Sequence, residues 1–392
     1  MKSLHLRIGT ALVSGIVFAL LVATAQEAIP PTESGDAGHD AVRAFGQGSE
    51  SNHWDLGLAT TGADISPDDR LLAVTLESPS APQKAREQIV EFLEVWDYRQ
   101  HTKISSTQLA TYVNIKPTPN AVRFSADGLL LTASDPTRLH VLEAATLKSI
   151  RLIEPPLEDG FRIFAVETSP IGHLVIIAAN HYTSGVLFAY DLDTGRLLFQ
   201  WKSPHGVSSI SWKQDGTLFA AATPFLCTRY RDTVHIFSTN PWQHLQMLTA
   251  RNPVSLAFSG EHLYLVESSS CKGSAFDRHL GLEAFAIRGW KRSKTLYLPH
   301  EDIHSFVSFA NGRLLANTGE VRTEHDWLDG TTTGINVNVQ FTIWKGDTSS
   351  VEFTSPPLAV PAHRVLLKSG LRLSRTGKMV LLYPQPQVFQ IP

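Results

Sequence analysis

The stretch "VRFSADGLLLTA", residues 122–133, decides the fold of this chain. Apolar and polar residues alternate up to a Ser, a polar tight turn follows, and an apolar run continues. Alternation with a period of two is typical of β-strands and Asp-Gly favours a turn, so the stretch predicts a β-hairpin. Because a lone hairpin is marginally stable in water, this one must pack on further strands.

The same phrase recurs along the chain, and each copy is followed by an apolar run that ends on a large side chain. The seven copies cover residues 63–74, 122–133, 166–178, 210–222, 256–266, 308–317 and 371–382. The large side chains that anchor the following runs are Trp96, Leu142, Tyr190, Phe237, Phe285, Trp344 and Phe389. Their successive spacings are 46, 48, 47, 48, 59 and 45 residues. This period predicts an all-β, seven-bladed β-propeller with four antiparallel strands per blade.

The stretch "VLFAYDLDTGRLLFQW", residues 186–201, supplies the outer half of the third predicted blade. Asp193, Thr194 and Gly195 are turn formers that separate two apolar, aromatic-rich runs. We expect the first run to be the third strand of the blade and the second run to be its outer strand.

The last predicted blade has three strands before Pro392 and lacks a fourth. An open strand edge promotes unwanted pairing, and propellers remove it by circular closure. We expect an N-terminal strand near residues 40–48, which contain "AVRAF", to pair with "QVFQI" and close the ring. The propeller domain then covers residues 40–392, with blades from about residue 55.

The N-terminus has the layout of a secretory signal peptide. Lys2 and Arg7 precede an apolar stretch over 8–23, and a small-x-small site lies before Gln26. We expect residues 1–25 to be cleaved, leaving a secreted or periplasmic protein without a membrane anchor. The alternative is an uncleaved anchor, although the apolar stretch is shorter than the ~20 residues that a span needs. Residues 26–39 are rich in Pro, Gly and acidic residues and predict a disordered linker.

Composition and motifs argue against several functions. The formal charge of −3 gives no electrostatic case for nucleic-acid binding. The phrase "HEDIH", residues 300–304, matches the zinc motif H-E-x-x-H, which requires a helix. In extended chain its two His lie about 13 Å apart, too far to share one ion. The sequence contains no nucleophile elbow, P-loop, dinucleotide fingerprint or Cys-x-x-Cys pair. We therefore expect no catalytic residues, metal or cofactor.

The turn phrases "FSADG", "SPDD", "WKQDG" and "SRTG" resemble the first hairpin of WD40-like propellers, over roughly residues 55–392. The phrase "SPHGVSSISWKQDG", residues 203–216, is similar to the His-to-Asp-Gly phrase of that family. Among the seven anchor side chains only Trp96 is the Trp of a Trp-Asp pair, with Asp97. Most blades lack this pair, so the buried His-Ser-Asp-Trp network of the family cannot be assembled. The resemblance implies a degenerate WD40-like ring of secreted, bacterial type, with lactonase-like and quinoprotein-like rings as alternatives.

Four connections between second and third strands are long, and in this family such connections lie on one face. They cover residues 77–88, 223–233, 267–281 and 317–338, whereas turns such as "SADG" on the other face are tight. Long loops on a rigid scaffold commonly carry binding sites. The candidate binding residues are Arg229, Tyr230, Arg231, Asp277, Arg278, His279, His325, Asp326 and Trp327. For each of them, a solvated or loop-packing role is the alternative.

Three hypotheses of function follow. The first is an exported, non-catalytic protein that binds a protein or carbohydrate partner through the face with the long loops. The second is an enzyme, of lactonase or dehydrogenase-like type, with His and carboxylate groups at the mouth of the central channel. The third is a structural subunit of the cell envelope.

The two cysteines, Cys227 and Cys271, predict one disulfide. They fall at equivalent places in the long loops of adjacent blades, where Cα atoms can approach the ~5.5 Å that a disulfide requires. An oxidising compartment favours pairing of an even number of cysteines. The alternative is two free or metal-bound thiols.

Overall fold

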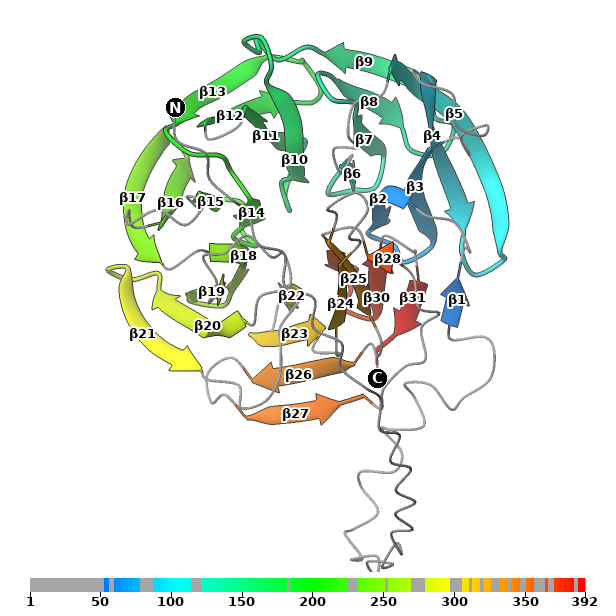
Figure 1. The fold of residues 1–392 in the computed structure, drawn as a ribbon. Helices are drawn as coiled ribbons and strands as arrows, with labels where there is room; N and C mark the ends of the chain where they lie inside the picture. The colour runs from blue at the N-terminus through cyan, green and yellow to red at the C-terminus, as the bar shows by residue number, and fades with distance from the viewer. Residues whose placement is uncertain are drawn as a thin grey trace, which may run out of the picture.

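The computed structural model is a ring of β-sheets around a central axis (Figure 1). It describes residues 53–55, 60–77, 88–113, 121–181, 184–223, 232–250, 253–268, 279–296, 305–309, 312–317, 321–325, 332–336, 340–345, 350–355, 364–365, 370–383 and 387–391. The described residues contain no helix long and apolar enough to span a membrane. The signal peptide and the linker lie outside the described residues.

Seven four-stranded antiparallel sheets form the blades, which confirms the predicted fold. The first blade contains β2 (Thr60–Ile65), β3 (Leu71–Glu77), β4 (Gln88–Asp97) and β5 (Thr102–Val113). The second contains β6 (Val122–Phe124), β7 (Leu130–Ser134), β8 (Leu139–Glu143) and β9 (Ser149–Ile153). The third contains β10 (Arg162–Thr168), β11 (Leu174–His181), β12 (Ser184–Asp191) and β13 (Leu197–Ser203). The fourth contains β14 (Ser209–Trp212), β15 (Leu218–Thr223), β16 (Asp232–Thr239) and β17 (Trp242–Ala250).

The remaining three blades follow the same pattern. The fifth contains β18 (Pro253–Ser259), β19 (His262–Ser268), β20 (His279–Ala286) and β21 (Lys291–Leu296). The sixth contains β22 (Ser305–Ser308), β23 (Arg313–Asn317), β26 (Phe341–Lys345) and β27 (Val351–Thr354). The seventh contains β29 (Gly370–Leu373), β30 (Met379–Tyr383), β31 (Gln387–Gln390) and β1 (His53–Asp55).

An N-terminal strand closes the last blade, but it lies later in the chain than the sequence predicted. β1 pairs antiparallel with β31, and His53 lies opposite Phe389. The closing strand is therefore residues 53–55 and not the segment near 40–48, which lies outside the described residues. A strand of three residues is too short to show an alternating pattern, so the longer "AVRAF" run attracted the prediction.

The anchor side chains of the repeat mark one structural position. In the first six blades the register between the third and fourth strands shifts immediately before the anchor, as at Ile236/Phe237 in the fourth blade. Such a β-bulge sharpens the local twist of the outer strand. The regular spacing of the anchor side chains in the sequence thus corresponds to the regular recurrence of this bulge in the first six blades.

The Ser of the repeated phrase closes the tight turn between the first two strands of a blade. Ser125 Oγ accepts a hydrogen bond from the N–H of Leu130 at 2.9 Å and donates one to Asp127 Oδ1 at 2.6 Å. Gly128 completes this turn with a φ of 76°, which only glycine adopts without strain. We call the face formed by these turns the tight-turn face.

The core lies between neighbouring blades. One buried cluster joins Ile176 and Leu187 of the third blade to Phe219 and Phe237 of the fourth. The rings of Phe219 and Phe237 stack at 4.7 Å. Each such side chain contributes about 2 kcal/mol by burial, so the stability of each blade depends on its neighbours.

The insertion in the sixth blade contains strands where the sequence predicted only a loop. β24 (Val321–His325) and β25 (Thr332–Asn336) form a hairpin, and β25 pairs with β28 (Arg364–Val365) before the seventh blade. The Asp-Gly pair at Asp329 and Gly330 is typical of a hairpin turn and was a signal for it in the sequence.

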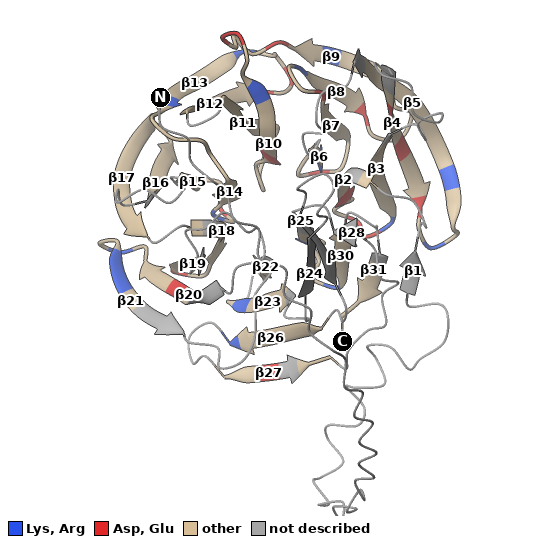
Figure 2. Ribbon diagram, in the orientation of Figure 1, with Lys and Arg blue, Asp and Glu red and all other residues tan. Residues whose placement is uncertain are grey.

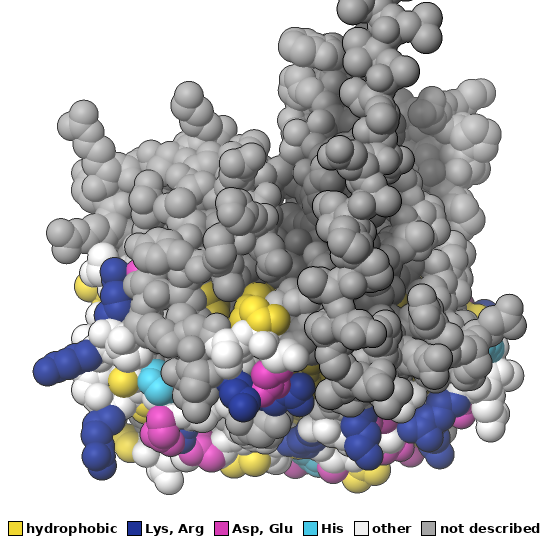
Figure 3. Space-filling model, turned by 90° about the horizontal axis from the view of Figure 1, so that it is seen from below, with side chains coloured by type: hydrophobic (Ala, Val, Ile, Leu, Met, Phe, Trp, Pro, Cys, Tyr) yellow, Lys and Arg dark blue, Asp and Glu magenta, His cyan; other side chains and the backbone are white. Residues whose placement is uncertain are grey.

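Charged residues of both signs are distributed around the described part of the ring (Figure 2). In the side view of Figure 3, acidic, basic and apolar side chains are mixed along the described part of the rim. Some charged residues also lie on inner strands, and one such pair is Arg123 on β6 with Glu167 on β10.

Candidate functional site

One position on the inner strand of each blade forms a ring inside the propeller. It lies two residues before the Ser, or its equivalent, that starts the tight turn. The seventh, first, second and third blades are consecutive around the ring, and in them this position carries charges of alternating sign. Its occupants are Arg372 on β29, Asp64 on β2, Arg123 on β6 and Glu167 on β10. The other three blades carry the uncharged Ser211, Ala257 and Val307. We call the four charged residues the channel cluster.

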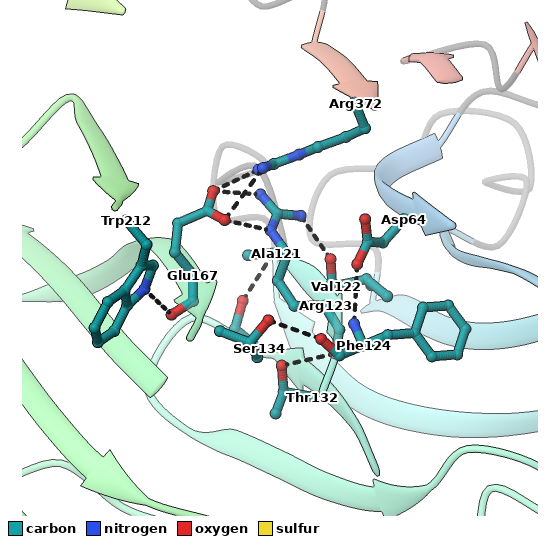
Figure 4. Close-up of polar contacts among 11 residues, drawn as sticks. Asp64, Ala121, Val122, Arg123, Phe124, Thr132, Ser134, Glu167, Trp212 and Arg372 are labelled. Atoms are coloured by element: carbon teal, nitrogen blue, oxygen red, sulfur yellow. Dashed lines mark hydrogen bonds and ion pairs between the residues drawn. The ribbon is translucent and has the colours of Figure 1, made fainter. Parts of the chain in front are cut away.

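Glu167 is the centre of the channel cluster (Figure 4). Arg123 donates to its carboxylate from Nε at 3.0 Å and from Nη2 at 2.9 Å. Arg372 donates from Nη1 at 3.1 Å and from Nη2 at 2.5 Å. Bidentate contacts of this kind are among the strongest hydrogen-bonded ion pairs. Two guanidinium groups therefore hold one carboxylate.

Hydrogen bonds from the same strands join neighbouring blades. Asp64 Oδ2 accepts the N–H of Phe124 at 2.9 Å, which ties the first blade to the second. Thr168 donates to the carbonyl of Phe124 at 2.7 Å, and the indole N–H of Trp212 donates to the carbonyl of Glu167 at 3.2 Å. The inner strands are thus linked in series through polar groups that would otherwise be buried without partners.

Burial changes the acidity of the two carboxyl groups. It raises the pKa of Glu167 to about 7, although the charge and hydrogen bonds of Arg123 act in the opposite direction. It also raises the pKa of Asp64 to about 6, against the charge of Arg123 and the N–H of Phe124. Both groups therefore titrate closer to neutral pH than solvent-exposed acids do.

The contacts of Glu167 leave it poorly placed to act as a general base. Each of its two oxygens accepts a hydrogen bond from Arg123 and another from Arg372, which fills the acceptor sites of a carboxylate. A general base needs a free acceptor within hydrogen-bond reach of the proton that it removes. The channel cluster instead connects the seventh blade to the third.

A second charged group lies on the tight-turn face. His173 Nε2 contacts Asp127 at 2.8 Å, and its Nδ1 contacts Asp193 at 2.7 Å. Partial burial lowers the pKa of His173, but its hydrogen bonds to Asp193 and Asp127 outweigh this, and the net shift is upward. The pKa of Asp127 falls to about 2, because hydrogen bonds from Ser125, Leu129 and His173 outweigh its burial. His173 thus joins the turns of the second and third blades.

Two of the nine predicted binding residues lie in strands. His279 begins β20 and pairs with Ser268 of β19, whereas His325 ends β24 and pairs with Thr332 of β25. They belong to different sheets, so no strand pairing brings them together. The other seven predicted binding residues lie outside the described residues, and these are Arg229, Tyr230, Arg231, Asp277, Arg278, Asp326 and Trp327.

Other predicted features also lie outside the described residues. These are Cys227, Cys271 and the "HEDIH" phrase at residues 300–304. The disulfide therefore stays a prediction. Within the described ranges, no group of three or more His, Cys, Asp or Glu side chains is arranged to hold a metal ion.

The channel cluster was missed at the level of sequence, although a signal for it was present. When the seven copies are aligned on the turn Ser, one column reads Asp64, Arg123, Glu167, Ser211, Ala257, Val307 and Arg372. Charged residues in a strand that is buried inside a ring are uncommon unless they are paired. The alternation of sign in this column predicts that pairing.

No family model matches the sequence, and no curated protein matches it. Among solved structures, a chain of the "Crystal Structure of Mitotic Checkpoint Complex" superposes with a TM-score of 0.60 at 15% identity. That match covers 89% of this chain and 96% of the other. The "Structure of U3-55K" gives a TM-score of 0.58 at 10% identity, covering 87% of this chain and 99% of the other.

Both neighbours are WD40-type propellers. This chain has the same fold. Because 1320 solved chains match it, the likeness does not select a function.

Proposed function

We propose that this protein is an exported, non-catalytic binding protein and that its partner is another protein. The partner binds the face that carries the long connections between second and third strands. One structural neighbour comes from the mitotic checkpoint complex, so the fold serves there as part of a protein assembly. The signal-peptide layout of residues 1–25 supports export.

The difference between the two ends of the blades carries this proposal. On the tight-turn face, turns such as Ser125–Gly128 are closed by their own hydrogen bonds. At the other end, residues 78–87, 224–231, 269–278 and 318–340 connect second to third strands, and the last of these includes the β24–β25 hairpin. Long connections on a rigid ring can carry the side chains that recognise a partner without changing the core.

Within the part of the chain that the structure describes, the channel carboxyls are the observation that favours an enzyme. Asp64 and Glu167 have raised pKa values inside a ring, which is a feature of catalytic acids. The occupied acceptor sites of Glu167 weigh against this reading, and a lactonase-type or dehydrogenase-like activity is therefore the second candidate. Hydrolysis assays with a panel of lactones, on wild type and on Asp64→Asn, test it directly.

The binding proposal is tested by replacing residues 318–340 with a short Gly-Ser linker, which keeps the strands of the sixth blade. Wild type and variant are cross-linked in envelope extract and the captured proteins are compared. A matched control, Leu129→Ser, changes the tight-turn face at a side chain that is 65% exposed. We expect the control to capture the same partner as wild type and the linker variant to lose it, with similar melting temperatures. Equal capture by all three proteins would contradict the proposal.

A further inference from the structure

Two imidazole rings meet at the outer part of the fourth blade. His235 of β16 is buried and His244 of the neighbouring strand β17 is exposed. His235 Nδ1 lies 3.0 Å from His244 Nε2, and the ring centroids are 5.1 Å apart. Two ring nitrogens therefore face each other, one of them next to solvent.

The surroundings fix the orientation of this pair. His235 Nε2 lies 3.0 Å from Thr233 Oγ1, which in turn lies 2.7 Å from Thr223 Oγ1. Trp201 of the third blade lies against both rings, at 4.6 Å from His235 and stacked at 5.8 Å on His244. The hydrogen bond at Nε2 directs Nδ1 of His235 toward His244, as an outer hydrogen bond orients a histidine that binds a metal.

Equivalent positions in two other blades contain an ion pair. Relative to the bulge at the anchor residue, the positions of His235 and His244 correspond to Glu94 and Lys103 in the first blade. There Lys103 Nζ lies 3.0 Å from the Glu94 carboxylate. In the fifth blade the corresponding pair is Glu283 and Arg292, at 2.9 Å.

In both ion pairs the cation also lies over the anchor ring. Lys103 is 5.7 Å from the centroid of Trp96, and Arg292 is 5.6 Å from that of Phe285. The fold therefore places a positive charge at this location in two blades. In the fourth blade the same two positions hold imidazole rings that share a hydrogen bond, and neither residue carries a fixed positive charge. A bound cation can replace the shared proton, because a neutral imidazole nitrogen is a metal ligand.

We propose that His235 and His244 bind a divalent transition-metal ion such as Zn²⁺ or Cu²⁺. Imidazole nitrogens bind these ions at about 2.0–2.1 Å, so two nitrogens 3.0 Å apart fit adjacent positions around one ion. His235 binds through Nδ1 and His244 through Nε2. Water fills the remaining positions and reaches the ion beside the exposed His244. Imidazole suits Zn²⁺ and Cu²⁺ better than it suits Mg²⁺ or Ca²⁺.

The experiment uses the full mature chain without a polyhistidine tag, stripped of metal with a chelator. ZnCl₂ and CuCl₂ are titrated at neutral pH, native mass spectrometry counts bound ions, and tryptophan fluorescence follows Cu²⁺. We expect one saturable ion per chain and quenching of the emission of Trp201, which Trp201→Phe reduces. His244→Phe keeps a ring on Trp201 but removes the nitrogen, and should weaken binding by about 10-fold or more.

Two further variants separate metal binding from folding. The double variant His235→Glu with His244→Lys reproduces the ion pair of the first blade, and we expect it to fold and to lose the ion. His101→Asn removes an exposed imidazole elsewhere and should bind as wild type does. Absence of a saturable ion in wild type, or equal affinity in wild type and His244→Phe, would overturn the proposal.

Discussion

Arg372 of the last blade forms a bidentate ion pair with Glu167 of the third blade, although 205 residues separate them in the chain. The pair connects the end of the propeller to its first half, next to Arg123 of the second blade. Circular closure therefore has two components. One is the backbone pairing of β1 with β31, and the other is this side-chain contact inside the ring.

Arg372→Gln should destabilise the protein. It leaves the half-buried Glu167 with one guanidinium in place of two, and we expect a loss of about 2 kcal/mol in the free energy of unfolding at pH 8. Urea denaturation measures this loss. Lys202→Gln is the matched control, because the Lys202–Glu158 pair is exposed, and it should change stability little. Equal losses in the two variants would contradict the role assigned to the channel cluster.

The loss in Arg372→Gln should shrink as the pH falls from 8 to 5. The folded-state pKa of Glu167 is about 7, above its ordinary value of 4.5, so the folded state holds its proton more tightly than the unfolded state does. Stability from this group is therefore present at low pH and is lost as the pH rises through 4.5 to 7. A protonated Glu167 is neutral, so its contact with the second guanidinium contributes less to the free energy of unfolding than the ion pair does. A loss that is the same at pH 5 and pH 8 would count against this explanation.

His173→Asn should destabilise the protein more at pH 6 than at pH 9. The pKa of His173 is raised by the carboxylates of Asp193 and Asp127, so the protonated ring favours the folded state. This contribution is complete below the ordinary pKa of 6.5 and disappears as the pH rises through the raised value. Unfolding curves at both pH values measure it. Asp193→Asn should reduce the same pH dependence, and a pH-independent effect of His173→Asn would contradict the assignment.

Truncation at the N-terminus locates the closing strand in solution. A chain that starts at Ser51 keeps β1 and should be as stable as a chain that starts at Gln26. A chain that starts at Leu58 lacks β1, exposes the edge of β31, and should lose about 2 kcal/mol. Denaturation of both chains provides the comparison. If the loss occurs already with the Ser51 start, an earlier segment closes the ring.

The double variant Trp327→Ala with Arg231→Ala should reduce partner binding and leave the melting temperature nearly unchanged. Trp and Arg are common anchors at protein interfaces, and both residues belong to the long connections. Cross-linking in envelope extract and thermal unfolding measure the two effects. Unfolding of the variant would show that these residues pack within the protein.

Cys227 and Cys271 should form a disulfide in protein purified from an oxidising compartment. Peptide mapping of the non-reduced protein should recover the two cysteines in one linked peptide. The bond closes a loop of about 44 residues and adds up to roughly 4 kcal/mol by the chain-entropy relation. Two thiols that react with an alkylating reagent would exclude it.

The sequence by itself determined the ring of seven blades. Alternation in "VRFSADGLLLTA" and the Ser125 and Gly128 turn chemistry act over a few residues, and repetition at a nearly constant period turns that local information into a global fold. The spacing of the anchor side chains predicted the period of the blades for the same reason, because in the first six blades the anchor marks a bulge between adjacent strands.

Only the tertiary structure decided which residues meet across the ring. The contact of Arg372 with Glu167 depends on circular closure, and closure depends on a three-residue strand that has no pattern of its own. The contact between His235 and His244 depends on the register of β16 and β17 after a bulge. The contact of Trp201 with His235 depends on the packing of the third blade against the fourth. Local periodicity specifies strands and turns, whereas side-chain contacts follow from the angles and registers that packing sets.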